Sequence, residues 1–281
     1  MPVLTELAPR PVFLINGMHK TGTTWLQRIL DAHPDMQCRA EDQFVKISDP
    51  LMKLFHDYNQ IIYVADAERD AQGTTAFDRE DAYSTYFFMV RLALAKAPPS
   101  LGWSGIKDNL INPDSFLQFI PNARVVHILR DPRDLVVSSW ASDRRLTGEA
   151  GNEWTHPHDE HIADVFRLWS KFASAVLARV KSDKDRVRFV RYEDLYQDFY
   201  ATVSALYAFF GVDNDAQTVA DVRTETDFSR LSKGRKPGEE DPNSFFRKGI
   251  AGDWVNALDP ASIAGHVDEH GDLMRNCGYL K

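Results

Sequence analysis

The chain has 281 residues and a formal net charge of -8, and its hydrophobic content of 43% is typical of a soluble globular protein with a substantial core. The negative charge argues against broad nucleic-acid binding, so any anionic ligand needs a local basic pocket. No apolar stretch approaches the length of about eighteen residues that a membrane span requires, and the N-terminus lacks a signal-peptide pattern. Because Cys38 and Cys277 are the only cysteines, we expect a protein without disulfide bonds in the reducing cytoplasm. The charge and the lack of a long apolar stretch add the expectation that it has no nucleic-acid partner and no membrane contact.

The first predicted elements are a strand over residues 11–16 and a helix over residues 23–33, joined by the loop GMHKTGTTW. The usual nucleotide-binding loop carries lysine directly after its second glycine, whereas here Thr23 holds that position and Lys20 lies inside the loop. Glycines permit a tight turn, and free N–H groups at the start of a helix bind phosphate. Lys20 would then reach over the ligand. The alternative, an ordinary turn with a solvated lysine, leaves the glycines and threonines of the loop unexplained.

A second pair of elements follows the same pattern, with a predicted strand over residues 123–129, the turn RDP and a helix over residues 133–141. Asp131 is a plausible N-cap for this helix, and Pro132 suits its first position. Asp134 completes a weak capping pattern. The helix is therefore predicted to begin directly after the turn.

The turn also brings an arginine to the end of the predicted strand. Arg130 can fork onto a phosphate, and Ser138 in the following helix can donate one hydroxyl hydrogen bond. The alternative is a surface ion pair of Arg130 with Asp131 or Asp134.

Further along the chain, the apolar spacing predicts a helix over residues 164–180 and a strand over residues 186–192. The strand is followed by a helix that ends near Phe210, where Gly211 is a natural C-terminal stop.

Two polar stretches carry further candidate residues. The stretch LSKGRKPGEEDPNSFFRKG is predicted to be a mobile loop that ends in the basic cluster Arg247-Lys248-Gly249, or else a solvated charged loop. The run HPHDEH over residues 156–161 matches no strong metal-ligand spacing, so we expect no metal site there. Residues 142–160 are instead expected to form part of a lid over the side of the site where a second substrate, the acceptor of a transferred group, would bind.

Strands that alternate with helices predict an α/β fold, here a single domain over residues 1–281 with a central parallel sheet flanked by helices and a P-loop-like nucleotide-binding architecture. Ligands of such sheets bind beyond the carboxyl ends of the strands. The loop around Lys20 and the turn at Arg130 both follow strand ends. We therefore expect them to converge on one ligand.

The motifs HKTGTTW, RDPRDLVVS and FFRKGIAGDW, in this order, resemble the donor-binding motifs of sulfotransferases that use 3'-phosphoadenosine 5'-phosphosulfate (PAPS). The resemblance runs from Phe13 to about Trp254. It implies an enzyme that moves a sulfuryl group from PAPS to a hydroxyl or amine of a small-molecule acceptor and releases adenosine 3',5'-bisphosphate (PAP). A sulfuryl group carries less charge than a phosphoryl dianion, so a divalent metal is less necessary.

The resemblance also implies roles for individual residues. Those implied to bind the 5'-phosphosulfate are Lys20, Thr21, Gly22, Thr23 and Thr24, with Lys20 the catalytic lysine beside the leaving oxygen. Those implied to lie on the adenine side are Trp25, Tyr192, Thr226 and Phe228. Those implied to grip or close over the 3'-phosphate are Arg130, Ser138, Arg247, Lys248 and Gly249.

The base that accepts the acceptor proton is less uniform in the family. Many small-molecule members carry a Lys-Thr-His segment, but this chain has Lys107, Asp108 and then Asn109 at the matching place. Another branch, which includes tyrosylprotein and heparan sulfotransferases, uses a glutamate that matches Glu41. The resemblance therefore implies Glu41 as the base, with Asp42 and Asp108 as alternatives and Lys107 assisting at the sulfuryl oxygens.

Two other functions compete with this interpretation. A P-loop nucleotide kinase would need lysine at the position of Thr23 and a carboxylate placed for magnesium. A catalytically silent nucleotide-binding module would keep the donor site, although the presence of both Lys20 and Glu41 weighs against it. The identity of the acceptor and the oligomeric state cannot be read from the sequence.

Overall fold

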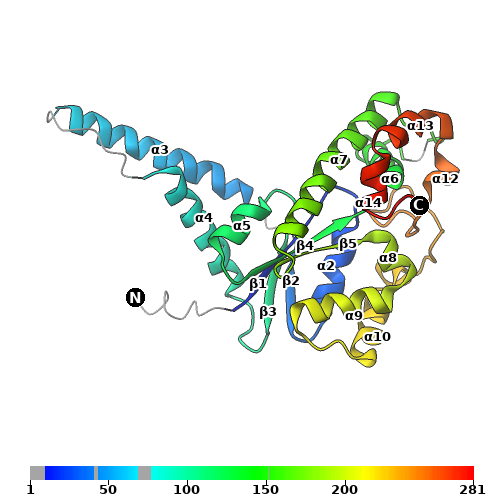
Figure 1. The fold of residues 1–281 in the computed structure, drawn as a ribbon, viewed down its shortest axis with the longest axis horizontal. Helices are drawn as coiled ribbons and strands as arrows, with labels where there is room; N and C mark the ends of the chain where they lie inside the picture. Colours follow the sequence, from blue (N-terminus) through cyan, green and yellow to red (C-terminus); the bar gives the residue numbers. More distant parts are fainter. Residues whose placement is uncertain (1–9, 41–43, 69–76, 151) are drawn as a thin grey trace. The chain divides into compact units, whose positions relative to one another are not determined.

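The computed structural model describes residues 10–40, 44–68, 77–150 and 152–281 (Figure 1). Its sheet has the strand order β2-β3-β1-β4-β5. The bounds of these strands are β1 Val12–Gly17, β2 Met36–Arg39, β3 Trp103–Lys107, β4 Ala123–Leu129 and β5 Val187–Arg191. The α/β fold with a parallel sheet flanked by helices, which the sequence predicted, is confirmed.

The contacts within the chain group it into two compact units. The first unit consists of Met1–Asn16 and Asp35–Val125, and the second of Gly17–Pro34 and Val126–Lys281. The loop around Lys20 and the turn at Arg130 both belong to the second unit.

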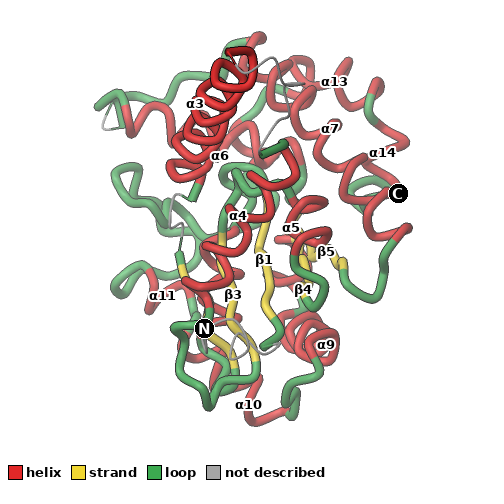
Figure 2. Tube along the Cα trace, turned by 90° about the vertical axis from the view of Figure 1, so that its left-hand side faces the viewer, coloured by secondary structure: helices red, strands yellow, loops and turns green. Residues whose placement is uncertain are grey.

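In the first unit, β3 pairs in parallel with both β1 and β2. β1 and β3 lie side by side in Figure 2. The register places Ile15 of β1 opposite Lys107 at the end of β3. Its helices are α3 Val45–Glu68, α4 Arg79–Leu94 and α5 Pro113–Phe119. None of these three helices, nor β2 and β3, was predicted from the sequence. α4 begins with a capping box, in which the side chains of Asp78 and Asp81 each accept a hydrogen bond from the other residue's backbone N–H.

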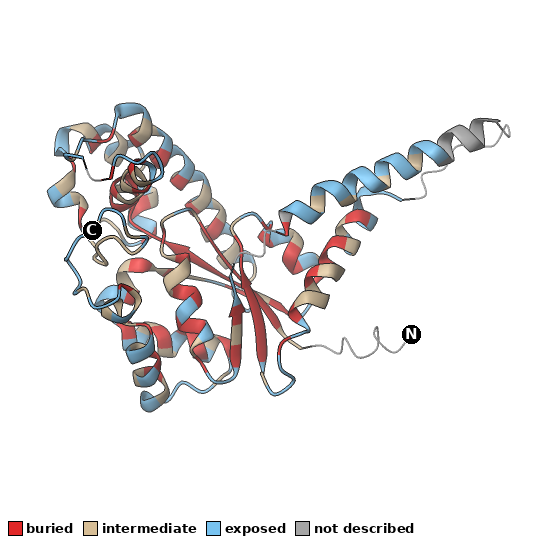
Figure 3. Ribbon diagram, turned by 180° about the vertical axis from the view of Figure 1, so that it is seen from behind, coloured by how far each residue is buried: buried red, intermediate tan, exposed pale blue. Residues whose placement is uncertain are grey.

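Every residue of β1 and of β3 is buried (Figure 3). Phe13 of β1 is fully buried, and its ring covers the backbone of Gly105 in β3 so closely that a Cβ atom at Gly105 would overlap three ring carbons. A glycine in β3 is therefore what allows this aromatic side chain to fill the core beside the strand.

The second unit contains the remaining helices of the described residues. Their bounds are α2 Thr23–Asp31, α6 Pro132–Leu146, α7 Asp159–Ser182, α8 Tyr192–Gln197, α9 Phe199–Phe210, α10 Ala216–Glu225, α11 Phe228–Leu231, α12 Trp254–Ala257, α13 Pro260–Glu269 and α14 Gly271–Asn276. All predicted helices are present. The predicted helix after β5 is interrupted at Asp198, which separates α8 from α9, and Gly211 ends α9 in the left-handed conformation with φ 67°.

The helix after the RDP turn begins as predicted. The Asp131 side chain accepts a hydrogen bond from the backbone N–H of Arg133, and Pro132 is the first helical residue. α6 then continues to Leu146 instead of ending at residue 141. The weak capping role predicted for Asp134 is wrong, because its side chain bonds to backbone groups near the end of the FFRKGIAGDW motif.

The predicted helix over residues 164–180 starts earlier, at Asp159. The lid predicted over residues 142–160 is therefore partly helical, because its first residues belong to α6 and its last to α7. His161 lies within α7, where its Nε2 atom is 3.0 Å from the Ser139 hydroxyl of α6. Among the described residues, no three His, Cys, Asp or Glu side chains are grouped so as to hold a metal ion.

α7 presents its predicted apolar stripe to the core, with Trp169 and Val176 fully buried. The Trp169 indole donates a 3.0 Å hydrogen bond to the carbonyl of Arg130. The core of this unit therefore holds the backbone directly after β4. Within the described ranges, no helix combines the length and apolar character that a bilayer crossing requires.

We expect Gly105→Ala to lower the free energy of unfolding by about 1–3 kcal/mol, because the added methyl group must displace the buried Phe13 ring. Urea unfolding followed by circular dichroism measures this. Gly265→Ala in α13 is the matched control, since nothing lies within 4 Å of its Cβ position. We expect that control to raise stability by about 0.4–1 kcal/mol. Equal effects of the two substitutions would contradict the close packing of Phe13 on β3.

Candidate functional site

The loop after β1 makes a tight turn that opens directly into α2. Thr21 donates from its backbone N–H and its hydroxyl to the Met18 carbonyl, at 3.2 Å and 2.7 Å. Lys20 and Gly22 both have positive φ angles, 69° and 98°. Gly22 occupies the N-cap position of α2 and supplies no side-chain hydrogen bond to the helix. Gly22 itself thus does not cap the first N–H groups of α2, and a helix start of this kind is suited to binding a phosphate.

Tyr192, at the start of α8, lies against this loop. A Cβ atom at Gly22 would lie 2.6 Å from Cδ2 of the Tyr192 ring. The positive φ and this contact both exclude a side chain at Gly22. The predicted phosphate loop and the predicted adenine-side tyrosine are therefore in direct contact.

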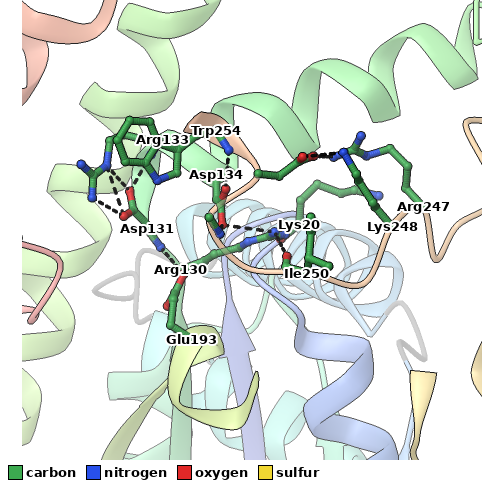
Figure 4. Close-up of polar contacts among 12 residues, drawn as sticks. Lys20, Arg130, Asp131, Arg133, Asp134, Glu193, Arg247, Lys248, Ile250 and Trp254 are labelled. Carbon is green, nitrogen blue, oxygen red and sulfur yellow. Dashed lines mark hydrogen bonds and ion pairs between the residues drawn. The ribbon is translucent and has the colours of Figure 1, made fainter. Parts of the chain in front are cut away.

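Arg130 connects the loop to the rest of the site (Figure 4). One terminal nitrogen, Nη1, donates to the carbonyl of Lys20 at 3.3 Å, and the other, Nη2, donates to the carbonyl of Ile250 at 3.1 Å. The guanidinium carbon lies 4.3 Å from the centre of the Tyr192 ring, close enough for a cation–π interaction. Its Nε atom is buried and has no hydrogen-bond partner among the described residues. The Lys20 loop and the Arg130 turn are thus in direct contact, and their convergence on one ligand stays a prediction.

The alternative prediction for Arg130, a surface ion pair, does not describe its environment. Arg130 is only 8% exposed. Asp131 instead pairs with Arg133, 2.6 Å away. Asp134 does approach Arg130, at 3.6 Å, but both side chains are buried.

Lys20 stands among other cations. Burial is the largest cause that lowers its pKa, to about 8, and the positive charges of Arg145, Arg130 and Arg247 lower it further. Its Nζ atom lies 4.8 Å from the centre of the Phe245 ring. Because the half-buried Lys20 amine and the guanidinium groups around it bring several positive charges together, this part of the structure favours the binding of an anion.

The residues predicted on the adenine side also lie near one another. The indole N–H of Trp25 donates to the Thr226 carbonyl at 3.0 Å, and the Trp25 and Tyr192 rings meet edge to face at 5.5 Å. The hydroxyl of Thr226 donates to the Val222 carbonyl at 2.7 Å, so the side chain of Thr226 is engaged within the helix that precedes it.

Phe228 lies under the backbone of Gly249, whose Cβ position falls on the Phe228 ring. Gly249 has a φ of 65°, a conformation that favours glycine. One residue of the basic cluster is thus packed on an aromatic ring that was predicted to be near the adenine.

The other two residues of the cluster are held by carboxylates. The buried Asp253 accepts from both Arg247 and Lys248, each at 2.6 Å, and Glu240 pairs with Arg247 at 2.5 Å. The Glu240 side chain is 37% exposed and that of Asp253 only 2%. Neither carboxylate was singled out in the sequence, although Asp253 belongs to the quoted motif FFRKGIAGDW.

The stretch predicted to be a mobile loop has neither helix nor strand between α11 and α12, but it has many internal hydrogen bonds. Arg235 donates to the carbonyls of Arg247 and Phe246, at 2.7 Å and 2.5 Å. The backbone N–H of Gly238 donates to the Lys248 carbonyl at 2.9 Å. These bonds fix the backbone that carries the basic cluster.

Ser138 lies half-buried in the second turn of α6. Lys107 ends β3 and is buried. Asp108 follows it, and its Oδ1 atom accepts from the backbone N–H of Leu110 at 2.7 Å. Glu41 and Asp42 lie outside the described residues, so the structure does not address the implied base.

Comparison with known proteins identifies the family. The model described as the sulfotransferase family matches residues 11–216, which is most of the chain. The chain belongs to the sulfotransferase family. The match includes residues of both compact units, and the family resemblance inferred from the three motifs is confirmed.

Relatives of this sulfotransferase are similar over most of their length. Cytosolic sulfotransferase 16 of Arabidopsis thaliana is 28% identical over 92% of this chain and 75% of the relative. Cytosolic sulfotransferase 17 of the same plant is 23% identical, with coverage of 95% and 75%.

Solved structures share the fold. The mouse sulfotransferase SULT7A1 complexed with PAP aligns with a TM-score of 0.59 at 18% identity, over 96% of this chain and 85% of that one. Retinol dehydratase in complex with retinol and PAP aligns with a TM-score of 0.57 at 19% identity, over 98% and 86%.

The low pKa of Lys20 predicts a pH dependence of anion binding. A bound anion favours the charged amine, so PAP affinity should be constant below the free-state pKa of about 8 and fall above it. We expect a loss of about tenfold between pH 7 and pH 9 in isothermal titration calorimetry. Lys20→Met should bind more weakly at pH 7 and lose this pH dependence. If the PAP affinity of Lys20→Met fell by the same factor between pH 7 and pH 9, another group would be responsible for the pH dependence.

Proposed function

We propose that this sulfotransferase moves a sulfuryl group from PAPS to a hydroxyl or amine of a small-molecule acceptor, as one domain over residues 1–281 in the cytoplasm. The observation that carries the proposal is the bond from the Arg130 guanidinium to the backbone carbonyl of Lys20, which holds together the two segments whose cationic side chains are needed at the two ends of PAPS. Relatives named as cytosolic sulfotransferases and alignments over both compact units support the location and the single domain.

The donor is proposed from this geometry and from the related structures with PAP. The N–H groups at the start of α2 and the hydroxyls of Thr23 and Thr24 would hold the 5'-phosphate. Trp25 and Tyr192 offer aromatic faces for the adenine. Arg130 and Ser138, with Arg247, Lys248 and Gly249 over them, would hold the 3'-phosphate.

Sulfuryl transfer breaks the bond between sulfur and the bridging oxygen of the donor and forms a bond between sulfur and the acceptor oxygen or nitrogen. Charge develops on the bridging oxygen as it leaves. An ammonium group beside that oxygen stabilises the charge. Lys20 is suited to this role, because its pKa of about 8 leaves most molecules charged at pH 7.

The proton of the acceptor must pass to a base, for which we propose Glu41, with Asp42 and Asp108 as alternatives. Asp108 is the weaker candidate, since one of its carboxylate oxygens already accepts from the N–H groups of Leu110 and Ile111. Lys107, at the carboxyl end of β3, is proposed to assist at the sulfuryl oxygens.

The proposed acceptor class is a small hydroxyl-bearing molecule. Structures of the related retinol dehydratase contain retinol or androsterone. A transfer assay with sulfur-labelled PAPS against alcohols, phenols, amines and sugars tests the proposal, with Lys20→Met as the inactive control. We also expect PAP, but not ATP, to raise the melting temperature. PAP binding without transfer to any acceptor would favour a silent nucleotide-binding module, and magnesium-dependent ATP hydrolysis would favour a kinase.

We expect Glu41→Gln to lower kcat by roughly 10²-fold or more, because the amide cannot take the acceptor proton. Its affinity for PAP should stay within about twofold of the original, since the donor site is unchanged. Asp42→Asn and Asp108→Asn are the matched controls and should retain most of the activity. A loss of kcat confined to one of these controls would move the base to that residue.

A further inference from the structure

The carboxylate of Asp134 joins two parts of the donor site that are far apart in the sequence. Its Oδ2 atom accepts from the backbone N–H of Gly252 at 2.7 Å, and its Oδ1 atom accepts from that of Trp254 at 3.0 Å (Figure 4). Its Oδ2 atom also lies 3.6 Å from Nη2 of Arg130. One side chain from the first turn of α6 therefore contacts both the arginine and the segment after the basic cluster.

Arg130 contacts the same segment directly, through the bond from its Nη2 atom to the Ile250 carbonyl. Asp134 and Arg130 thus hold three residues of the segment, Ile250, Gly252 and Trp254, by one carbonyl and two N–H groups. Gly252 has a φ of 80°, which allows the chain to turn so that both N–H groups meet one carboxylate.

Burial makes this arrangement specific. The Asp134 side chain is fully buried, and a buried carboxylate is strongly unfavourable unless hydrogen bonds and a counter-charge compensate for lost hydration. Here the compensation comes from the segment and from Arg130 together. Displacement of either one would leave a buried charge under-bonded, so the position of the arginine and the position of the segment depend on each other.

We infer that Asp134 is the positioning residue through which recognition of the donor's 3'-phosphate by Arg130 is coupled to the segment that follows Arg247-Lys248-Gly249. The inference rests on the proposed use of PAPS. Asp134 does not touch the donor. It fixes the guanidinium in the orientation that grips the phosphate, and it fixes the backbone that brings the basic cluster over the same phosphate.

The alternative is that Asp134 only stabilises the fold. The ratio of the affinities for two ligands, one with and one without a 3'-phosphate, distinguishes a positioning role from this structural role. PAP and adenosine 5'-monophosphate (AMP) share the adenosine and the 5'-phosphate, but only PAP carries the 3'-phosphate. We expect Asp134→Asn to weaken PAP binding roughly 10- to 100-fold and AMP binding by less than about threefold. A general loss of stability would weaken both ligands alike.

Asp131→Asn is the matched control. Asp131 is likewise buried and lies at the start of the same helix, where it is the N-cap, but its partner is Arg133 and not Arg130. This variant should lower the melting temperature while leaving the ratio of PAP to AMP affinity near its original value. An equal loss of the ratio in both variants would overturn the specific role of Asp134.

A double-mutant cycle tests whether Asp134 acts through the arginine. In an Arg130→Met background, Asp134→Asn should lower the PAP to AMP ratio by a clearly smaller factor than in the original protein, because one of the two groups that Asp134 positions is absent. Full additivity of the two substitutions would overturn the proposed coupling.

Hydrogen exchange keeps the inference testable if Asp134→Asn does not fold. In the unmodified protein, PAP should slow exchange of the amides of residues 252 and 254 more than AMP does at equal saturation. Equal protection would overturn the coupling. Should the unmodified protein bind PAP no more tightly than AMP, the proposed donor would fall and the role of Asp134 with it. Retention of the ratio by Asp134→Asn would remove that role alone.

Discussion

The guanidinium of Arg130 is the group on which the arrangement of the site depends. It donates to a carbonyl of the loop after β1 and to a carbonyl beyond the basic cluster, and it lies over the Tyr192 ring. The backbone carbonyl of Arg130 accepts a hydrogen bond from the buried Trp169 indole. Because arginine offers five N–H donors in one plane, it can hold two protein segments and still face a phosphate. A lysine at this position would supply charge without that bridging geometry.

The elements that could be predicted from the sequence are those with mostly apolar strands or regularly spaced apolar helix positions, and with clear boundaries. β4 follows this rule, and so does α9 with its terminal Gly211. β3 could not be predicted, because its sequence WSGIK contains the serine and the small Gly105 that the Phe13 ring requires. α3 carries apolar side chains on its exposed surface, including Leu54 at 61% exposure, so its pattern indicates no single buried face.

The candidate site shows a similar division. Lys20 and Arg130 could be predicted because local motifs carry them, and the contact between their segments followed from the strand ends of a parallel sheet. The partners of Asp134 could not be predicted, since Gly252 and Trp254 are distant in the sequence and contribute only backbone N–H groups. Nor could the pairing of Arg247 with Asp253 and Glu240, because a run of mixed charges does not specify which of them meet.

Gly22 and Gly249 each place bare backbone against an aromatic ring, that of Tyr192 and that of Phe228. Because glycine has no side chain, each ring can pack directly against the main chain, and the main chain limits how far the ring can move toward it. A side chain introduced at either glycine would have to displace its ring, because the Cβ position already overlaps ring carbons. The places of both rings are therefore inherited from two positions that carry no side chain, and a redesign that shifts a ring has to substitute the aromatic residue itself.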